Sequence, residues 1–498
     1  MRSSMAHSHG KAAEVQSPVP LERLLGGIDV LRAQGGRGAP PIAGVMVTGV
    51  THDSRLVTAG SLFCCLRGSR RDGHDHARDA VEAGASVLLC ERPVDLGPGL
   101  DAVQVIVADA RAAMAPVAAA FWGHPSRRLA VAGITGTNGK TTVTWLLRSV
   151  LETAGTPAEV IGTLSGTHTT PEAPELQSRL AEMAAAGTGA VAMEVSSHAL
   201  AQHRVDAMWF DVVAFTNLSQ DHLDFHHTMD SYFMAKASLF DPARARVAVV
   251  NADDPWGRRL AATTALPVRT FTAADAQDVR PRRDGTSFTW EGRRVELRLP
   301  GAFNVGNALA AATVAREMGV DADAVAAGLG AVGSVPGRFE RVDGGGEVAV
   351  VVDYAHTPAG LENALGAARA LAPAPARVIA VFGAGGDRDH DKRPAMGEVA
   401  SRLADLAVLT TDNPRDEDPA AIIAEVVAGA GGRSSLAVEP DRRAAIALAL
   451  DAARPGDVVV IAGKGHETDQ VFGGGRVEPF DDRAVARAEL ARRGLGAP

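Results

Sequence analysis

The chain of 498 residues is long enough for about three domains, each with a core of its own. Hydrophobic residues make up 46% and charged residues 22%, a composition that excludes wholesale disorder and a collagen-like fibre. The formal net charge of −9 argues against a general nucleic-acid binder, although a local positive pocket can still bind an anionic substrate.

The first segment, residues 1–20, is polar and has no apolar signal core, so we expect a loose tail. No run of 18 uncharged apolar residues occurs, and a membrane-spanning helix is not expected. The three cysteines fall in two apolar runs that predict strands, so their thiols should be buried and reduced. The cysteines are Cys64, Cys65 and Cys90, and the runs are residues 61–66 and 86–90. These features indicate a cytoplasmic protein.

Short apolar runs alternate with Ala-rich helical stretches along almost the whole chain, which is typical of α/β proteins with mainly parallel sheets. The clearest predicted strands are residues 129–134, 189–193, 212–216, 247–251, 378–382, 406–411 and 457–462. Helices are predicted after most of them, for example over residues 141–154 and 420–428. Charged and apolar residues alternate over 285–299, which predicts a β-hairpin inside an otherwise parallel domain.

Two Gly- and Pro-containing segments interrupt this alternation, at residues 123–127 and 333–337. Such breaks mark domain boundaries. The sequence therefore predicts three domains, 1–126, 127–336 and 337–498.

The strongest local signal is a strand that runs into a Gly-rich turn and then into a helix, residues 129–142 (LAVAGITGTNGKTT). Ile134 stands where the literal P-loop pattern has a glycine, so the segment is a variant of that pattern. Glycines let backbone N–H groups face phosphate oxygens at a helix N-terminus. We expect Lys140 to reach the β- and γ-phosphates and the Thr141 hydroxyl to ligate magnesium. An ordinary strand-to-helix turn does not explain Gly-Lys-Thr-Thr at this junction.

Two further strands of the same domain end in polar clusters that contain Glu194 and His222. In a doubly wound sheet, ligand groups gather at the carboxyl ends of the strands. We therefore expect both side chains in the crevice of the phosphate loop, where a second magnesium would bind. Four other histidines lack such support and are interpreted as surface or packing residues: His198, His203, His226 and His227.

Three loops that follow strands of the last domain carry charges of both signs: residues 383–389, 411–415 and 463–467. The first resembles a dinucleotide fingerprint, but Arg388 replaces its last glycine, so a nicotinamide cofactor is not expected. Together the loops offer three cations and two carboxylates: Arg388, Arg415, Lys464, Asp412 and Glu467. Such a set suits a zwitterionic ligand, and a salt-bridged loop edge is the competing interpretation.

With these motifs in place, the chain resembles the Mur ligase superfamily from about residue 53 to residue 467. Residues 136–142 (GTNGKTT) are specific to the superfamily, whereas 169–172 (TTPE), 193–198 (MEVSSH) and 202–204 (QHR) are typical of its diaminopimelate-adding branch. The resemblance implies an α/β protein with three domains. They are a small N-terminal α/β domain, a central P-loop ATPase-like domain with a parallel sheet, and a C-terminal Rossmann-like domain.

The resemblance also implies roles for single residues. The UDP-muramoyl dipeptide would contact Ser54, Thr169, Thr170, Ser196, Gln202 and Arg204. ATP would contact Gly136, Thr137, Asn138, Gly139, Lys140, Thr141, Thr142, Asn304, Arg338 and Asp353. Diaminopimelate would contact Arg388, Asp412, Asn413, Pro414, Arg415, Gly463 and Glu467. Magnesium would involve Thr141, Glu194, His222 and Lys236, the last as the family's carbamylated lysine (N6-carboxylysine). Catalysis would depend on Lys140, Glu194, His222, Lys236 and Arg338.

The implied activity is the ATP-dependent addition of diaminopimelate to the D-glutamyl side-chain carboxylate of UDP-N-acetylmuramoyl-L-alanyl-D-glutamate, through an acyl phosphate. This step belongs to peptidoglycan synthesis, and with it to cell-wall biogenesis, cell shape and cell division. The family's selectivity motif, Asp-Asn-Pro-Arg, is unaltered at residues 412–415. Lysine-adding relatives usually lose its arginine, and only diaminopimelate has a second carboxylate for Arg415 to hold. Both the meso and the LL isomers fit the motif.

The implied partners are ATP, Mg²⁺ and the two substrates, and the protein is expected to be a monomer that binds neither nucleic acid nor membrane. Because different domains supply the ATP and amino-acid contacts, hinge closure is expected to complete the site. The nearest rival interpretation is a lysine-adding or folylpolyglutamate-type ligase of the same superfamily. A nucleotide-binding regulatory protein without turnover is a more distant one. The interpretation as a P-loop kinase or GTPase does not explain the charged loops of the last domain, residues 411–415 and 463–467.

Overall fold

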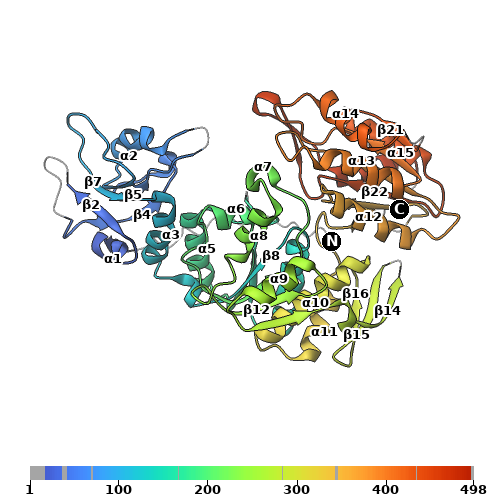
Figure 1. The fold of residues 1–498 in the computed structure, drawn as a ribbon, viewed down its shortest axis with the longest axis horizontal. Helices are drawn as coiled ribbons and strands as arrows, with labels where there is room; N and C mark the ends of the chain where they lie inside the picture. Colours follow the sequence, from blue (N-terminus) through green and yellow to red (C-terminus); the bar gives the residue numbers. More distant parts are fainter. Residues whose placement is uncertain are drawn as a thin grey trace. The chain divides into compact units, whose positions relative to one another are not determined.

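The computed structural model describes residues 17–35, 42–68, 71–166, 168–282, 284–342, 346–432 and 435–494. The chain forms two compact units. Unit 1 comprises residues 1–131, 170–189 and 198–210, and unit 2 comprises residues 132–169, 190–197 and 211–498. Figure 1 colours the elements by their position in the sequence.

Unit 1 is built around a five-stranded sheet with strand order β2-β7-β6-β5-β4, parallel apart from the β2–β7 pair. Its strands are β1 (Val19–Pro20), β2 (Val30–Gln34), β3 (Met46–Val47), β4 (Gly49–Thr51), β5 (Ser61–Cys64), β6 (Val87–Cys90) and β7 (Val103–Val107). Its helices are α1 (Leu21–Leu25), α2 (Ala77–Glu82), α3 (Ala110–Phe121), α5 (Ala173–Ala185) and most of α6 (Ser197–Ala201). Successive residues of a strand point to opposite faces, so Leu62 packs in the α3 core and Phe63 in the α2 core.

Two predictions about this unit can be compared with the structure. The cysteines are buried free thiols, as predicted. The predicted loose tail is wrong at its end, because Val19 and Pro20 form β1, which pairs with β3. Residues 1–16 lie outside the described residues.

The first sheet of unit 2 has the strand order β13-β12-β11-β8-β10-β9, and its pairs β9–β10, β8–β11 and β12–β13 are parallel. The strands are β8 (Ala130–Thr135), β9 (Ala158–Ile161), β10 (Ala190–Glu194), β11 (Phe210–Phe215), β12 (Ala245–Asn251) and β13 (Val268–Phe271). The helices of this part are α4 (Lys140–Thr153), α7 (Leu223–His226), α8 (Met229–Ala237), α9 (Pro255–Thr263), α10 (Ala302–Glu317) and α11 (Ala322–Ala331). The predicted hairpin is confirmed as β15 (Gly285–Trp290) and β16 (Arg293–Leu297), and β14 (Gln277–Arg282) adds a third antiparallel strand.

The second large sheet of unit 2 has the strand order β17-β18-β22-β19-β20-β21 and is parallel apart from β17. Its strands are β17 (Glu340–Arg341), β18 (Ala349–Asp353), β19 (Val378–Phe382), β20 (Leu406–Leu409), β21 (Leu436–Val438) and β22 (Val458–Ala462), with the hairpin β23 (Asp469–Phe472) and β24 (Arg476–Pro479). Its helices are α12 (Pro358–Leu371), α13 (Lys392–Leu403), α14 (Pro419–Gly429), α15 (Arg442–Ala452) and α16 (Asp482–Arg492).

Helices cover both faces of this second sheet, so its strands are apolar on both sides. Val460 of β22 packs with residues of α12, α13 and α14, whereas its neighbours Val459 and Ile461 pack with α15 and α16. The loops after β19, β20 and β22 therefore emerge at one edge of the sheet, where ligand groups gather in doubly wound folds.

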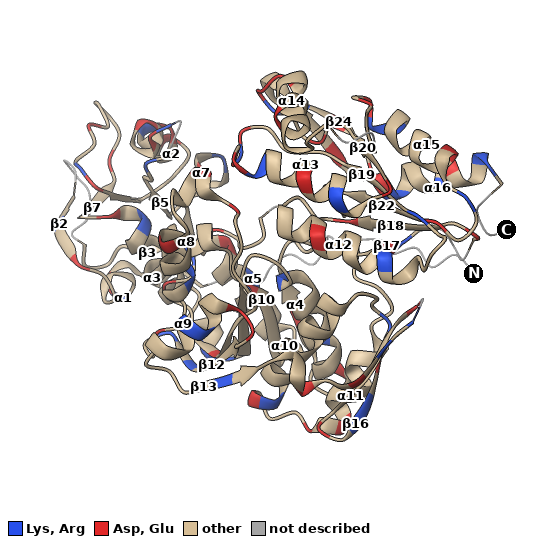
Figure 2. Cartoon of the chain, turned by 45° about the vertical axis from the view of Figure 1, so that its right-hand side comes forward, with Lys and Arg blue, Asp and Glu red and all other residues tan. Residues whose placement is uncertain are grey.

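Acidic and basic residues are interspersed along most of the elements drawn in Figure 2. Among the described residues, no helix is both long enough and apolar enough to cross a membrane.

Candidate active site

The phosphate loop connects β8 to α4, and its glycines are required by the conformation of the backbone. Gly139 has a φ of 89°, in the left-handed region that favours glycine. A Cβ atom there would lie 2.4 Å from Oδ1 of Asn307. At Gly136 a Cβ would lie 1.9 Å from Oγ1 of Thr216. The loop is therefore held against α10 and the end of β11, and backbone N–H groups at the start of α4 are left for phosphate.

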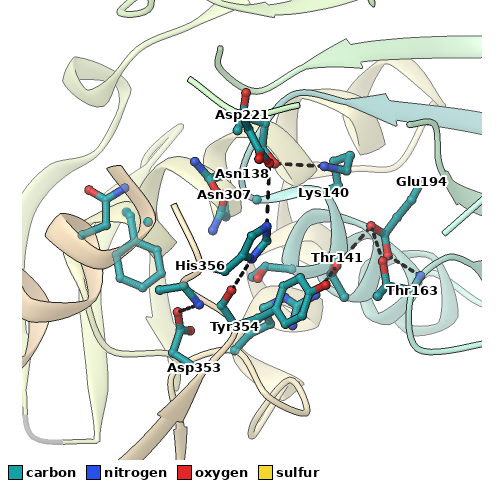
Figure 3. Close-up of a pocket in the computed structure, with 18 of the residues that line it drawn as sticks. Asn138, Lys140, Thr141, Thr163, Glu194, Asp221, Asn307, Asp353, Tyr354 and His356 are labelled. Atoms are coloured by element: carbon teal, nitrogen blue, oxygen red, sulfur yellow. Dashed lines mark hydrogen bonds and ion pairs between the residues drawn. The ribbon is translucent and has the colours of Figure 1, made fainter. Parts of the chain in front are cut away.

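A cavity of about 220 Å³ lies beside this loop (Figure 3). It is lined by the predicted phosphate-loop residues 137–142, by Glu194 and His222, and by Arg338 and Asp353. The Arg338 side chain donates from Nη2 to Oγ1 of Thr141 at 3.0 Å. Residues predicted to bind ATP from two parts of the sequence therefore meet in one cavity.

Lys140 lies at the entrance to α4 with its ammonium turned back on the loop. Its Nζ donates to the carbonyl oxygens of Gly136 and Thr137, both at 2.9 Å. Burial lowers the pKa of Lys140, and the nearby carboxylates of Glu194 and Asp221 oppose that shift. A phosphate oxygen would form a stronger hydrogen bond with this ammonium than a neutral carbonyl oxygen does, because the phosphate is negatively charged.

Glu194 ends β10 and is 1% exposed. Its carboxylate accepts hydrogen bonds from Oγ1 of Thr141 at 3.1 Å and from the backbone N–H of Thr163 at 2.9 Å. A hydroxyl beside a carboxylate is the oxygen donor set that magnesium prefers. The described residues contain no group of three or more His, Cys, Asp or Glu side chains able to hold a metal.

Lys236 of α8 is 1% exposed and donates from Nζ to the carbonyl oxygen of Gly136 at 2.9 Å. Its ammonium lies 4.7 Å from the ring centroid of Tyr232. Burial, and secondly the charge of Lys140, hold the pKa of Lys236 well below its ordinary value. The residue is therefore not the solvated helix lysine that its sequence alone suggests.

Asp221 was not predicted as a site residue, although it lines both this cavity and the next. It lies 3.3 Å from Nε2 of His222, 3.7 Å from Nε2 of His356 and 3.7 Å from Nζ of Lys392. Burial alone would raise the pKa of Asp221, but the hydrogen bond with His356 and the charges of His222 and Lys392 outweigh it and lower the pKa. The available signal was its place next to His222 at a strand end. His356 and Lys392 offered no signal beyond their residue types.

The second cavity, of about 160 Å³, is lined by the three charged loops of the second sheet. Its predicted lining residues are Arg388, Asp412, Asn413, Arg415, Gly463 and Glu467. Pro414 is buried and is not among the residues that line it. Asp221, His222, Tyr354 and His356 line both cavities, so the two sites share a wall.

The two arginines that line the second cavity lack carboxylate partners among the described residues. Within the described ranges, neither Arg388 nor Arg415 has a carboxylate within ion-pair distance, and Arg415 donates only to the carbonyl of Gly386, at 2.6 Å. Burial and the neighbouring Arg388 lower the pKa of Arg415. Oδ1 of Asp412 is buried and accepts no hydrogen bond from described residues. A buried acceptor without a donor costs about 1–3 kcal/mol, which a ligand ammonium would recover.

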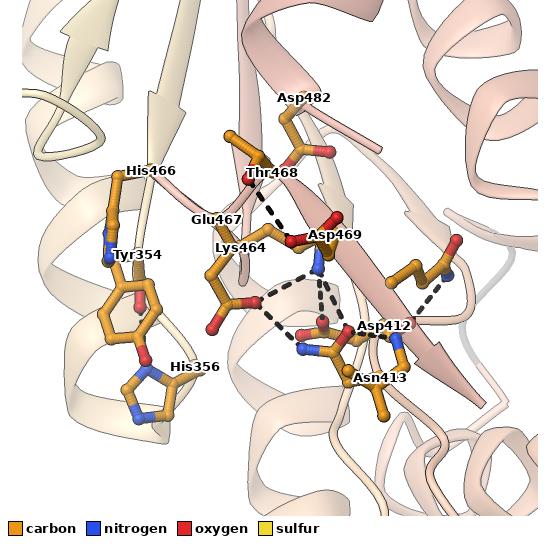
Figure 4. Close-up of polar contacts among 12 residues, drawn as sticks. Tyr354, His356, Asp412, Asn413, Lys464, His466, Glu467, Thr468, Asp469 and Asp482 are labelled. Carbon is orange, nitrogen blue, oxygen red and sulfur yellow. Dashed lines mark hydrogen bonds and ion pairs between the residues drawn. The ribbon is translucent and has the colours of Figure 1, made fainter. Parts of the chain in front are cut away.

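Lys464 does not line the second cavity, although the sequence interpretation grouped it with the charged residues expected to contact the ligand. Its side chain is fully buried, and its Nζ donates to Oδ1 of Asn413 and Oε2 of Glu467, both at 3.1 Å (Figure 4). It lies beneath the lining residues rather than among them.

A third cavity, of about 200 Å³, shares Asn138 and Gly139 of the phosphate loop with the first. Asn307, Phe271 and Phe303 line it, whereas the predicted adenine contact Asn304 does not. The Asn304 side chain is buried, donates to the carbonyl of Pro300 and accepts from Nδ2 of Asn307 at 3.0 Å. Asn304 therefore positions Asn307, and the sequence interpretation overlooked Asn307 because one motif contains both asparagines.

The residues predicted to hold the UDP-linked substrate are divided between the two units. In unit 1, Arg204 donates to the carbonyl of Thr170 at 2.8 Å and to Oε1 of Gln202 at 2.7 Å, and pairs with Glu172. His52, two residues before Ser54, lies within electrostatic range of Glu172 and Arg204. In unit 2, Thr169 and Ser196 line the cavity beside the phosphate loop.

Two of the four histidines without a predicted role have side-chain partners of an ordinary kind. Nδ1 of His203 lies 2.6 Å from Oδ2 of Asp206, and His226 stacks on Tyr232 with ring centroids 5.0 Å apart.

The fold, with a glycine-rich loop between β8 and α4 beside a cavity, is that of enzymes that bind a nucleoside triphosphate on a variant of the P-loop. The chain matches the Mur ligase middle domain over residues 134–315, the Mur ligase glutamate ligase domain over 337–465 and the Mur ligase family catalytic domain over 46–125. Three curated relatives are called UDP-N-acetylmuramoyl-L-alanyl-D-glutamate–2,6-diaminopimelate ligase. The protein of Syntrophomonas wolfei is 44% identical over 90% of this chain and 95% of its own. Those of Gloeobacter violaceus and Streptomyces coelicolor are 46% and 45% identical, over 93% and 91% of this chain and 98% and 94% of theirs.

Solved structures give the same result. A UDP-N-acetylmuramoyl-L-alanyl-D-glutamate–2,6-diaminopimelate ligase is 30% identical, with a TM-score of 0.65, and the match covers 96% of this chain and all of that one. The MurF ligase of Thermotoga maritima, solved with ADP, shares the fold at 21% identity and a TM-score of 0.63, over 89% of this chain and 98% of its own.

The chain belongs to the Mur ligase family. It is an ATP-dependent ligase that forms a carbon–nitrogen bond in the synthesis of peptidoglycan precursors.

Proposed function

We propose that this ligase joins diaminopimelate to the D-glutamyl side-chain carboxylate of UDP-N-acetylmuramoyl-L-alanyl-D-glutamate. The observation that carries the proposal is the second cavity, where Arg388 and Arg415 have no carboxylate partner among the described residues and share the lining with Asp412 and Glu467. Two free guanidiniums suit two carboxylates, and two carboxylates suit an ammonium. Diaminopimelate has both sets of groups, whereas lysine lacks the second carboxylate.

In the first half-reaction, the substrate carboxylate attacks the γ-phosphorus of ATP. An oxygen–phosphorus bond forms, the bond to the β-phosphate oxygen breaks, and ADP leaves with its electron pair. The phosphoryl group needs positioning and charge neutralisation more than covalent help from the protein. Lys140 and Arg338 supply positive charge, since both line the cavity and both contact the start of α4 or its loop.

In the second half-reaction, a deprotonated amino group of diaminopimelate attacks the acyl carbon. The carbon–nitrogen bond forms, the bond to the phosphate oxygen breaks, and inorganic phosphate leaves while the nitrogen loses a proton to solvent. The wall shared by the two cavities supports this step, because Asp221 and His356 line both the phosphate side and the amino-acid side. The acyl phosphate and the attacking amino group can therefore meet at the shared wall, and neither has to move from one cavity to the other.

Magnesium fits the donor set at Thr141 and Glu194, with His222 lining the same cavity. When bound, the ion neutralises charge on the phosphate oxygens. Lys236 is proposed to carry a carbamate, formed when its amine adds CO₂ and releases a proton. Its lowered pKa supports this, because only the neutral amine can form the bond.

The remaining proposals concern partners and location. Unit 1 binds the UDP-linked substrate through Ser54, Thr170, Gln202 and Arg204, and the protein acts as a cytoplasmic monomer without nucleic acid or membrane. Arg204 supports the first proposal, since its guanidinium is held in place by Thr170, Gln202 and Glu172.

The test is a turnover assay of the purified chain with ATP, magnesium and UDP-N-acetylmuramoyl-L-alanyl-D-glutamate. Meso-diaminopimelate, LL-diaminopimelate, lysine and glutamate are supplied separately, and ADP release and amide product are both measured. We expect turnover with a diaminopimelate isomer at a kcat/KM at least about 100-fold above that with lysine, the value of a bidentate carboxylate contact. Preference for lysine or glutamate would assign the chain to another branch of the family. ATP binding without amino-acid-dependent ADP release would overturn the assignment of turnover.

A further inference from the structure

Two buried charged residues lie close to the second cavity, the proposed amino-acid site, and the roles assigned from sequence motifs explain neither of them. Lys464, in the loop after β22, and Arg442, at the start of α15, are both fully buried. Neither lines the cavity. A buried charge is expensive unless it is paired and hydrogen-bonded, so both residues need an explanation in terms of what they hold in place.

Lys464 connects two of the loops that form the cavity. Its Nζ donates to Oδ1 of Asn413 in the loop after β20 and to Oε2 of Glu467 in its own loop. Nδ2 of Asn413 donates to the same Oε2 of Glu467, at 2.9 Å. One oxygen of the Glu467 carboxylate is therefore held by two donors, and within the described part of the chain Oε1 accepts no protein hydrogen bond. Oε1 is the oxygen left for a ligand.

The same ammonium balances the charge of the second acid. Nζ of Lys464 lies 4.0 Å from Oδ1 of Asp412, which is too far for a hydrogen bond but close enough for attraction. Without this cation, the carboxylates of Asp412 and Glu467 would repel each other across the cavity wall.

Arg442 provides a second layer beneath these groups. Its guanidinium pairs with Asp482 through two hydrogen bonds, at 2.8 and 2.7 Å, and donates to the carbonyl of Ala462 at 2.9 Å. Asp482 lies close to the Lys464 loop in Figure 4. Burial alone would lower the pKa of Arg442, but Asp482, Asp412 and Glu467 raise it. Asp482 supplies the counter-charge that allows two cations to lie beneath one cavity.

We infer that Lys464 is a positioning residue of the amino-acid site: it fixes the Glu467 carboxylate so that Oε1, beside Asp412, receives the ammonium group of the incoming amino acid. The inference rests on the proposed function and adds a residue to it. Lys464 does not line the cavity, so we expect its effect on the ligand to pass through the residues that it holds, chiefly Glu467.

The experiment is a double-mutant cycle of Lys464→Met and Glu467→Gln, with KM measured separately for diaminopimelate and for ATP. Loss of a charge-assisted hydrogen bond predicts a rise of about 10- to 100-fold in the KM for diaminopimelate with Lys464→Met. The KM for ATP should change by less than about 2-fold, since the loop beside Lys140 is untouched. In the Glu467→Gln background, Lys464→Met should add less than about 3-fold, because the group it acts through is already gone.

Arg377→Met is the matched control, because Arg377 forms a partly buried ion pair with Asp457 in the same part of unit 2, with Nη2 and Oδ2 2.7 Å apart. It should lower thermal stability and leave both KM values unchanged. Lys464→Gln, which keeps one donor, repeats the cycle should Lys464→Met fail to fold.

Two results would overturn the inference and leave the proposed function intact. In the first, Lys464→Met and Glu467→Gln raise the KM for diaminopimelate independently, so that their effects multiply in the double mutant. In the second, Lys464→Met leaves the KM for diaminopimelate unchanged. Failure of the wild-type chain to use diaminopimelate would remove the proposed function, and this inference with it. The two failures are distinguishable because the second appears before any substitution is made.

Discussion

The charge of Lys140 is the single feature on which phosphoryl transfer depends most directly. Its ammonium donates to two backbone carbonyl oxygens, from which phosphate oxygens can take it over once they enter the cavity. We expect Lys140→Ala to lower kcat by about 100- to 1,000-fold, the usual cost of removing one preorganised charge from a transition state. Steady-state ADP release measures this, with far-UV circular dichroism as the control for folding. Wild-type turnover in this variant would show that the loop is not the ATP site.

Arg415 should decide between substrates rather than set the rate. In Arg415→Met, we expect the preference for diaminopimelate over lysine to fall by about 10- to 100-fold, because only diaminopimelate has a second carboxylate to lose its partner. The ratio of the two kcat/KM values measures the effect. Arg402→Met removes an exposed guanidinium that is paired with Glu362 in the same part of the chain, and should leave the ratio unchanged. An unchanged ratio in Arg415→Met would place the second carboxylate elsewhere.

For single residues, the sequence predicted a role correctly where the motif has one common function, and incorrectly where the residue type can serve two. A Gly-Lys-Thr-Thr turn has few explanations, and its residues do line a cavity with Arg338. Lys464 was grouped with the ligand contacts because a lysine in a charged loop can serve either a ligand or its neighbours. Only the structure shows that its ammonium is fully buried and used by Asn413 and Glu467.

At the scale of elements, the alternation of apolar runs and helices was sufficient to predict the parallel sheets. The strand predicted at 378–382 coincides with β19, and that at 406–411 continues two residues beyond β20. What sequence could not supply was β14, whose residues are all exposed and so lack the apolar alternation of a half-buried strand.

The turn from β8 to α4 offers a test of an element rather than of a side chain. Gly139 and Gly155 both have a positive φ, 89° and 84°, so alanine at either should cost about 1 kcal/mol of stability. A Cβ at Gly139 would meet Asn307, whereas nothing lies within 4 Å of one at Gly155. We therefore expect Gly139→Ala, and not Gly155→Ala, to weaken ATP binding by at least about 10-fold. Titration with a fluorescent ATP analogue and urea unfolding measure the two effects. Equal ATP affinity in both variants would contradict the role given to this turn.

For the whole molecule, the sequence predicted three α/β domains with boundaries near residues 126 and 336, and the family matches begin and end near these positions. The division at those boundaries stays a prediction. The shared wall of the two cavities was not predicted from the sequence, because Asp221 and His356 are 135 residues apart and were assigned no role themselves, although each stands close to a residue that was, His222 and Asp353 respectively.

The stability of the whole fold should be sensitive to acid at one particular histidine. His466 packs against Tyr354, with ring centroids 5.2 Å apart, and burial together with Arg338, Arg483 and Lys464 lowers its pKa to about 4. Since the unfolded chain takes up this proton at a pKa of about 6.5, the folded state loses stability as pH falls from about 6.5 to about 4. We expect this loss to be on the order of 2 kcal/mol, after a discount for solvent screening.

In His466→Gln the amide oxygen can still accept from Arg338, but no proton is taken up in this range. The variant should therefore lose about 2 kcal/mol less than the wild type between pH 7 and pH 4.5, as judged by urea unfolding at both values. Carboxylates that titrate in the same window affect both proteins equally and cancel in the difference. An identical loss in the two proteins would mean that His466 gains a proton without cost, and that the cations around it do not govern the acid stability of this part of the fold.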